Sequence, residues 1–594
     1  MNEKKIGFKN IIIFIVSIFA IISLNINLDI SKGFIEAFSA NSVVWIFVLC
    51  FFYWLLSDVS KIDDKRLKIT CIIIAVILAL MEVVGNSLDA YLNLDGLFYN
   101  KRVFVRAMCK VCGFTLVIYS ILCKLFWRLK ELKLSNIEAK YFTCNKRSFL
   151  LVWLVIFLAW IPYLLKYYPG ITTPDSFDQI CQGLGLTQLT NHHPVTHTAF
   201  IAIFMNIGKA VGNYNLGIAL YSIFQMLILS SSFSFGIYYM AKKNIDCRWR
   251  IISLLFLALY PVNGMYSITM WKDIPFAVCM LIFVIMLYEI VSSKGNFFDS
   301  KKNIFLFVLS MISVILFRNN GIYVVVLTLP IILLAYRKYY KKIAGIFLFI
   351  LCAYAIWKGP VFNLLGVEKG SSREALSIPL QQFARIVKEH SDELTDEEKE
   401  NIHKYLKTRD LDELYDPRLS DNVKATFDDE YFKKDKKTFI TTWTKLCFKY
   451  PKTVVESLLC NSYGYWYPEF QYWVVARSTV NSDNDGKIVL PIEQQSLLEN
   501  ARWNNYDSFI EKRNIPIISM LFSIGFVFWL VVVSFGYVIY KKEYKKLLIF
   551  VPVLVLWLTC LASPVSGEYR YMYAMFAMIP ILIGISLINN KEVV

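Results

Sequence analysis

Charged residues are scarce in this chain, and their scarcity excludes most soluble folds. Only 18% of its 594 residues are charged, whereas 56% are hydrophobic and 16% are aromatic. Apolar runs recur that are long enough to cross the ~30 Å hydrocarbon core of a bilayer. The composition therefore predicts an all-α polytopic membrane protein.

Motifs of nucleotide-dependent enzymes and of disulfide or zinc frameworks are also missing. The sequence has neither a Walker-type phosphate loop nor a glycine-rich dinucleotide motif. Its thirteen cysteines lie mostly inside apolar runs, without paired spacing. The net charge of +17 comes from Lys and Arg in short loops between apolar runs, so we attribute it to membrane orientation and expect no nucleic-acid partner.

We expect about fourteen spanning helices. They are predicted near residues 8–28, 42–58, 68–86, 103–127, 149–167, 215–240, 250–268, 274–292, 303–317, 321–336, 342–358, 515–540, 546–562 and 571–588. This number places every strongly basic loop on one side, which the positive-inside rule makes cytoplasmic. Both termini are then cytoplasmic, in a cell membrane. The apolar segment 195–211 is predicted to be a juxtamembrane or re-entrant helix on the outer face.

The predicted spans divide the chain into four regions. A four-span block covers 1–148, a core covers 149–358 with an outer loop at 168–213, and a charged insertion at 359–514 precedes three final spans at 515–594. We expect the insertion to be extracytoplasmic and mostly helical, with helices near 377–390 and 395–406. It also carries an aromatic cluster: Tyr463, Tyr465, Trp466, Tyr467, Tyr472 and Trp473.

The first outer loop of the core carries the most distinctive polar group. No Lys or Arg occurs between Lys166 and Lys209, yet three of the five histidines of the protein fall there. With no cation nearby along the chain, Asp175 is a candidate general base whose pKa burial would raise. Asp175 and Asp178 could instead only stabilise a helix N-terminus after Pro174. His192, His193 and His197 leave open a site for a divalent cation, or a purely hydrogen-bonding role.

Three cations end other spans on the same predicted face. Lys272 precedes Asp273, Arg318 precedes Asn319, and Arg570 follows Glu568 and Tyr569. A guanidinium keeps its charge and can donate two hydrogen bonds to a phosphate. Each cation could also form only a local ion pair or an interfacial anchor. Because isolated cations at span ends would lack partners, we expect Lys272, Arg318 and Arg570 to converge on one cavity.

The order of these features resembles the GT-C class of membrane glycosyltransferases, which includes protein O-mannosyltransferases and aminoarabinose and oligosaccharyl transferases. Tyr168-Pro169-Gly170, Asp175-Ser176 and His193-Pro194, followed by a run to Gly212, match the acidic outer loop, His-Pro motif and juxtamembrane helix of that class. The resemblance covers about 149–358 and the last three spans. Many members have a second carboxylate where this chain has Ser176. The segment 379–382, the Tyr-Pro-Gly triplet and the Lys-Asp and Arg-Asn pairs also resemble those of a bacterial family of uncharacterised proteins.

The resemblance implies a GT-C-like bundle that moves a sugar from a polyprenyl-phosphate donor to an extracytoplasmic hydroxyl on a glycan, lipid or protein. Asp175 would then accept the proton of the attacking hydroxyl. The lipid phosphate would be held by Lys272, Arg318, Asn319 and Arg570. The acceptor pocket would contain Ser176, Asp178, Gln179, His192 and His193. Supporting positions would be Asp273, Glu568, Tyr569 and Gln382. No cofactor is firmly implied, and a divalent cation remains open.

Two other classes of function fit parts of the sequence. A transporter or lipid-linked glycan flippase would use the polar residues to line a passage, but no internal repeat is evident and the polar groups gather on one face. A non-enzymatic assembly or binding protein of the envelope would use the aromatic cluster around Trp466. That alternative leaves the polar groups of the core without a role.

The basic loops generate a prediction of orientation. In a cysteine-free variant of the protein in intact cells, a single cysteine introduced into the insertion should react with a membrane-impermeant maleimide. A cysteine beside Lys242 should react only after permeabilisation. The opposite labelling pattern would invert the predicted topology and contradict extracytoplasmic chemistry.

Overall fold

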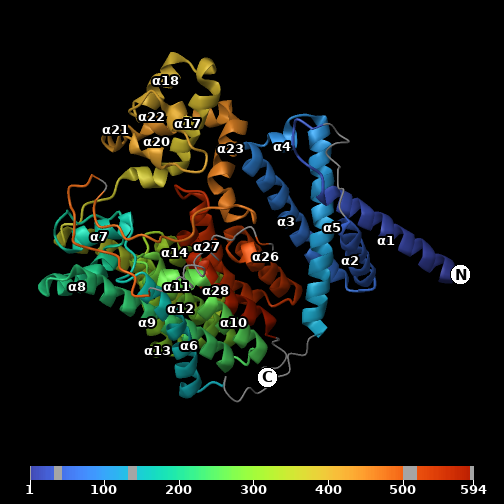
Figure 1. The fold of residues 1–594 in the computed structure, drawn as a ribbon, viewed down its shortest axis with the longest axis horizontal. Helices are drawn as coiled ribbons and strands as arrows, with labels where there is room; N and C mark the ends of the chain where they lie inside the picture. Colours follow the sequence, from blue (N-terminus) through green and yellow to red (C-terminus); the bar gives the residue numbers. More distant parts are fainter. Residues whose placement is uncertain are drawn as a thin grey trace.

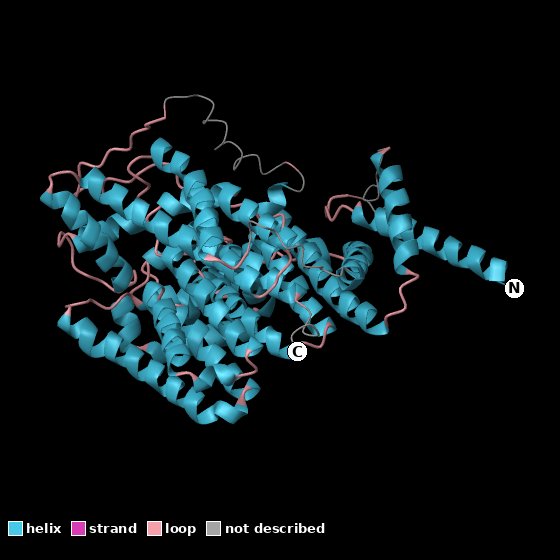
Figure 2. Ribbon diagram, turned by 90° about the horizontal axis from the view of Figure 1, so that it is seen from below, coloured by secondary structure: helices cyan, strands magenta, loops and turns pink. Residues whose placement is uncertain are grey.

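The protein is described by a computed structural model that covers residues 2–32, 43–131, 143–483, 485–498, 515 and 518–588. Over these residues the fold is helical, with isolated β-bridges and no β-strand (Figures 1 and 2). The all-α prediction is therefore confirmed. Residues 132–142 of the predicted basic loop and residues 499–514 of the predicted insertion lie outside the described part.

The helices follow the predicted order. The N-terminal block contains α1 (Asn2–Leu24), α2 (Val44–Val59), α3 (Lys65–Tyr91), α4 (Asp95–Phe98) and α5 (Lys101–Glu131). The core contains α6 (Lys146–Lys166), α7 (Pro174–Gly183), α8 (Val195–Ala210), α9 (Tyr214–Lys242), α10 (Cys247–Leu259), α11 (Pro261–Ile268), α12 (Asp273–Ser292), α13 (Lys301–Phe317), α14 (Gly321–Ala335), α15 (Tyr340–Ile356) and α16 (Phe362–Leu364). The last part contains α25 (Ile518–Leu521), α26 (Ile524–Tyr540), α27 (Val551–Leu561) and α28 (Tyr569–Leu587). Short 3-10 or π segments link some of these helices: η2 (Asn296–Asp299), η3 (Arg337–Tyr339), η4 (Trp357–Val361) and η9 (Tyr544–Phe550).

A multi-pass membrane protein is supported by the length and composition of these helices. Nine helical segments in the described chain are long and apolar enough to cross a membrane, and a tenth is obtained if α10 and α11, which meet at 51°, form one bent span. The predicted spans at 42–58, 303–317, 321–336 and 515–540 coincide with α2, α13, α14 and α26, which have only 15 to 17 residues. The count of fourteen spans therefore stays a prediction.

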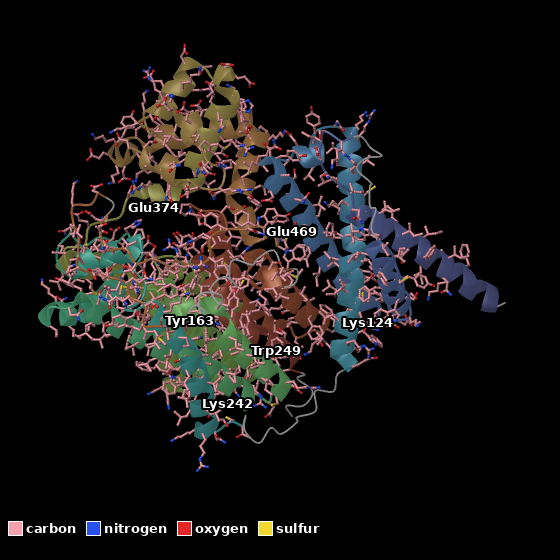
Figure 3. All side chains as sticks on the ribbon, viewed as in Figure 1. Lys124, Tyr163, Lys242, Trp249, Glu374 and Glu469 are labelled. Carbon is pink, nitrogen blue, oxygen red and sulfur yellow. The ribbon has the colours of Figure 1, made fainter. Side chains whose placement is uncertain are left out.

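Helices α12 and α28 form the centre of the core. They pack against each other, α12 also packs against α9 and α13, and α28 also packs against α26. The bend before α11 begins at Pro261, which provides no backbone N–H for a helical hydrogen bond. Gly264 lets α11 approach α6, since a Cβ there would lie 2.3 Å from the ring of Tyr163, which Figure 3 labels. This close packing fixes the loop that follows α11, from which Lys272 projects.

The insertion is a helical unit with its own apolar core (Figure 1, top). Its elements are η5 (Ser372–Leu376), α17 (Ser377–His390), η6 (Ser391–Glu393), α18 (Asp396–His403), α19 (Leu411–Leu414), α20 (Asp421–Ala425), α21 (Asp429–Lys434), α22 (Lys436–Lys449), α23 (Pro451–Ser462) and η7 (Tyr463–Tyr465). The helix predicted at 377–390 is confirmed as α17. The aromatic cluster joins the insertion to the C-terminal helices: the Tyr465 hydroxyl lies 2.8 Å from Ser563 Oγ, and Trp529 Nε1 donates to the Trp466 carbonyl at 3.0 Å.

The insertion also contacts the N-terminal block. Arg418 forms an ion pair with Asp89 at the end of α3, at 3.1 Å, and Lys452 forms one with Asp95 of α4, also at 3.1 Å. The α3–α4 end of the block lies beside α23 (Figure 1). The insertion and the N-terminal block, which are far apart in the sequence, therefore meet at one end of the molecule.

Candidate functional site

A polar cavity of about 470 Å³ lies between the core and the insertion. Seven of the residues proposed from the sequence line it: Asp175, His192, His193, Lys272, Arg318, Asn319 and Arg570. The predicted convergence of the three cations is thus confirmed. The volume lies within the roughly 300–1,000 Å³ of typical small-molecule sites.

Several helices begin at this cavity. Asp175 lies in the first turn of α7, Pro194 directly precedes α8, Lys272 precedes α12, Asn320 precedes α14, and Arg570 lies in the first turn of α28. The N-terminus of a helix carries partial positive charge and unpaired N–H groups. The backbone therefore adds to the side-chain cations in favouring an anion here.

Backbone pairing places Lys272 beside α7. The Ile171 N–H donates to the Ile268 carbonyl, and the Met270 N–H donates to the Ile171 carbonyl, both at 2.9 Å. Trp271 Nε1 then donates to Thr173 Oγ1 at 2.8 Å. The outer loop before α7 and the loop before α12 are therefore held in register, although about a hundred residues separate them.

Asp175 is ion-paired, contrary to the expectation that it lacks a cation. Its Oδ2 accepts a hydrogen bond from Arg570 Nη1 at 2.7 Å and lies 3.3 Å from Lys272 Nζ. Burial alone would raise the pKa of Asp175, but the charges of Lys272 and Arg570 outweigh burial and hold this pKa well below its usual range. The predicted rise in pKa is therefore wrong, because both cations come from distant parts of the chain.

His193 is a neutral imidazole with one buried nitrogen that hydrogen-bonds to no described residue. It is 2% exposed, and its Nδ1 lies 3.0 Å from Lys272 Nζ. Burial and the Lys272 charge lower the pKa of His193 to about 2, so the ring is uncharged at neutral pH. Because an ammonium can only donate, Nδ1 accepts and Nε2 carries the proton. Among the described residues, Nε2 has no hydrogen-bond partner.

Three other residues proposed for the outer-loop pocket do not line the cavity. Ser176 caps α7, since its Oγ accepts from the Thr173 N–H at 2.6 Å. Gln179 is buried, with its Oε1 2.9 Å from His197 Nδ1. Asp178 is exposed and lies three residues after Asp175 on α7. These side chains hold or flank the loop and do not form the cavity wall.

The arrangement of histidines and carboxylates gives no metal site. His197 Nε2 lies 2.7 Å from the Tyr221 hydroxyl, so both of its nitrogens are engaged inside the core. Within the described residues, no group of three or more His, Cys, Asp or Glu side chains could hold a metal ion.

Arg318 is a buried counterion of Asp273. Its Nη1 donates to Asp273 Oδ1 at 2.6 Å and to the Tyr571 carbonyl at 3.1 Å, and the two charged side chains are 8% and 1% exposed. Asn319 donates to the Asn191 carbonyl at 3.1 Å and so holds the loop before His192. Arg318 and Asn319 thus support the wall that they also line.

The remaining supporting residues lie outside the cavity wall. Glu568 is 3.3 Å from Arg570 Nε, and burial raises the pKa of Glu568 to about 7 against the opposing charge of Arg570. The Tyr569 hydroxyl lies 2.6 Å from that of Tyr260 in the core. Gln382 accepts from Trp443 Nε1 at 2.7 Å inside the insertion, away from the core site.

The sequence did not indicate that the insertion forms one wall of the cavity. This wall consists of Arg373, Glu374, Asp421, Lys424 and Ala425. Lys424 Nζ donates to Glu374 Oε2 at 2.8 Å, and Glu374 lies where the insertion meets the core in Figure 3. Charged residues are ordinary in such a segment, so no local signal separates these from the others.

The buried Arg318–Asp273 pair gives a prediction of stability. Arg318→Met should destabilise the protein by about 3–5 kcal/mol, because it leaves a buried carboxylate without its counterion. The double variant Arg318→Met/Asp273→Leu should recover most of the loss. Thermal unfolding of the purified protein in detergent measures both, and an unchanged single variant would contradict the assignment.

The raised pKa of Glu568 gives a prediction of pH dependence. Arg570 faces Glu568, Asp273 and Asp175 lie nearby, and the Tyr465 hydroxyl accepts from the Glu568 N–H. Below pH 7 Glu568 is neutral and no longer competes for Arg570. A short dialkyl phosphate, whose single charge is constant, should therefore bind more tightly at pH 6 than at pH 8, by at most about tenfold. In Glu568→Gln this dependence should disappear.

Comparison with known proteins identifies a family and no relative of known activity. No curated protein and no solved structure matches the chain significantly. The profile of a family of unknown function, DUF6020, matches residues 184–592, which include every cavity residue except Asp175. Since the match covers more than half of the sequence, the chain belongs to the family of unknown function DUF6020.

Proposed function

We propose that the protein is a GT-C-type membrane glycosyltransferase that moves a sugar from a polyprenyl-phosphate donor to an extracytoplasmic hydroxyl. The observation that carries the proposal is the meeting of a carboxylate, Asp175, with Lys272 and Arg570 in one cavity where several helices begin. The acceptor belongs to a glycan, a lipid or a protein of the cell envelope. The donor comes from the bilayer around the predicted fourteen spans.

Sugar transfer requires a base and a phosphate site that are separated by about the length of one sugar ring. The acceptor oxygen attacks the anomeric carbon, the bond from that carbon to the phosphate oxygen breaks, and polyprenyl phosphate leaves with the electron pair. Asp175 takes the proton of the acceptor, while Lys272 and Arg570 stabilise the charge on the leaving phosphate. Both cations contact Oδ2 of Asp175, and no described residue hydrogen-bonds to Oδ1. We therefore assign the proton transfer to Oδ1 and keep Arg318, bound by Asp273, as a supporting cation.

An apolar groove near the cavity suits the lipid part of such a donor. It has a volume of about 190 Å³ and is lined by side chains of α8, α9 and α12 and by Phe317. Its residues Ile274 and Pro275 come directly after Asp273 on α12, so the groove begins within one helical turn of Lys272. An isoprenoid chain in this groove would leave its phosphate close to the cations.

Two observations weigh against the alternative functions. The polar residues of the cavity gather at one end of the helices, whereas Lys242 lies at the opposite end of the core (Figure 3), and a transport passage needs polar groups between the ends. Four of the six aromatic residues are buried, including Tyr465 at 0% and Trp466 at 7% exposure, and only Trp473, at 44%, is exposed, which leaves little aromatic surface for a glycan or partner.

The proposed base gives the main functional prediction. Asp175→Asn should abolish sugar transfer, with a loss of about a hundredfold to ten-thousandfold, because an amide accepts no proton at neutral pH. Membranes containing the variant are incubated with a panel of radiolabelled polyprenyl-phosphate sugars, and labelled product is measured. Thr173 and Ser176 cap α7, and Asp175 does not, so the variant should remain folded and inserted.

Asp178→Asn is the matched control for this experiment. It removes the same charge from the same helix at an exposed position, so it should have a much milder effect on transfer. Near-normal transfer by Asp175→Asn, or a larger loss at Asp178, would remove the base assignment.

A further inference from the structure

We propose that Lys272, Arg570 and the Nε2–H of His193 form one phosphate-ester site, and that a bound phosphate and the Asp175 carboxylate compete for its cations. The inference deepens the proposed function and rests on it, because it identifies the donor phosphate as the group that frees the base. It also moves His193 from the acceptor pocket to the phosphate site, as a binding residue, and leaves Arg318 outside the site.

The contacts of Asp175 carry the first step. Lys272 Nζ and Arg570 Nη1 both contact the same oxygen, Oδ2, at 3.3 and 2.7 Å. The Lys272 and Arg570 side chains are 16% and 15% exposed, and that of Asp175 is 30% exposed. All three side chains line the cavity. A phosphate that enters the cavity meets the same ammonium and guanidinium that Asp175 contacts, so the two anions share the positive charge of these groups. Its arrival therefore weakens the hold of both cations on the carboxylate.

His193 carries the second step, independently of the carboxylate. Its Nδ1 accepts from Lys272, which leaves the proton on Nε2, and this buried N–H of a cavity-lining ring is unpartnered among the described residues. A buried donor without a partner is unfavourable, so a ligand oxygen that accepts from it gains that interaction on binding. The ring adds a directed donor without a third charge. Together the three groups offer donors that match a phosphate.

Charge balance shows why an incoming phosphate must displace a carboxylate. Arg570 contacts Glu568 as well as Asp175, and Arg318 is neutralised by Asp273. The cations of the core are thus already compensated in the absence of a ligand. An added anion therefore competes with these carboxylates for the core cations, and Asp175 is the one of the three that lines the cavity.

The competition between phosphate and Asp175 sets an order in which the donor binds before the acceptor reacts. Without donor, Asp175 is held as a weak base by the two cations. When the phosphate takes the cations, Asp175 loses their stabilisation and gains a negative neighbour, and both changes make it more basic. The base is therefore strongest only while a donor occupies the cavity.

The test measures binding of farnesyl phosphate, which has no sugar to transfer, to the purified full-length protein in detergent at pH 7.5. Asp175→Asn should bind this probe roughly tenfold more tightly than the wild type, about 1.4 kcal/mol, since the competing charge is gone. Asp178→Asn is the charge-matched control and should bind as the wild type does. Equal or weaker binding by Asp175→Asn would overturn the proposal, as would the absence of binding by both proteins.

A second pair of variants tests His193 without a change of charge. His193→Gln keeps an amide N–H near the position of Nε2 and should retain most of the affinity for farnesyl phosphate. His193→Asn places its amide near Nδ1 and should lose about tenfold, because the donor is gone. Equal affinities of the two variants would exclude His193 from the site.

The outcomes separate this inference from the proposed function. Tighter binding by Asp175→Asn in a protein that transfers no sugar from any donor of the panel would support the competition and remove the glycosyltransferase assignment. Loss of transfer in Asp175→Asn without tighter binding would keep the glycosyltransferase assignment and remove the competition.

Discussion

The ion pair of Asp175 with Arg570 and Lys272 is the interaction on which the arrangement of the site depends. It joins residues that are 395 and 97 positions apart in the chain. Charges near the apolar part of a membrane protein are costly unless they are compensated, so each charge at these helix ends requires a partner from another helix. The requirement brings the beginnings of α7, α12 and α28 to one place. The Arg318–Asp273 pair extends the same compensation to the loop between α13 and α14.

The two roles proposed for the cavity place opposite demands on its charges. A phosphate site needs cations, while a general base needs to be free of them. In this cavity the two cations contact one oxygen of Asp175, and the second oxygen has no described partner. The neutral His193, which contacts Lys272, adds a donor without adding charge.

Patterns along the sequence predicted the helices and the polar groups at their ends, because both depend on residues that are near each other in the chain. The apolar runs predicted the membrane helices, and the helix predicted at 377–390 is α17. The polar groups at 175, 272, 318 and 570 stand out against apolar neighbours, so their convergence could be inferred. The partners of Asp175 could not, because a sequence shows which cations are near along the chain and not which helices adjoin. For the same reason Ser176 and Gln179 were placed in the pocket, although the capping geometry and the His197 contact turn them inward.

The contacts between the insertion and the N-terminal block have a consequence for biosynthesis. Asp89 and Asp95, which bind Arg418 and Lys452, lie more than three hundred residues ahead of these partners. Since a chain is made from its N-terminus, α3 and α4 are complete before the ribosome reaches the insertion. The insertion therefore folds onto a surface that already exists, and the block acts as an internal assembly platform. A truncated chain that lacks residues 1–148 would still contain every cavity residue. It would lack the surface of the N-terminal block against which the insertion, and with it one wall of the cavity, packs.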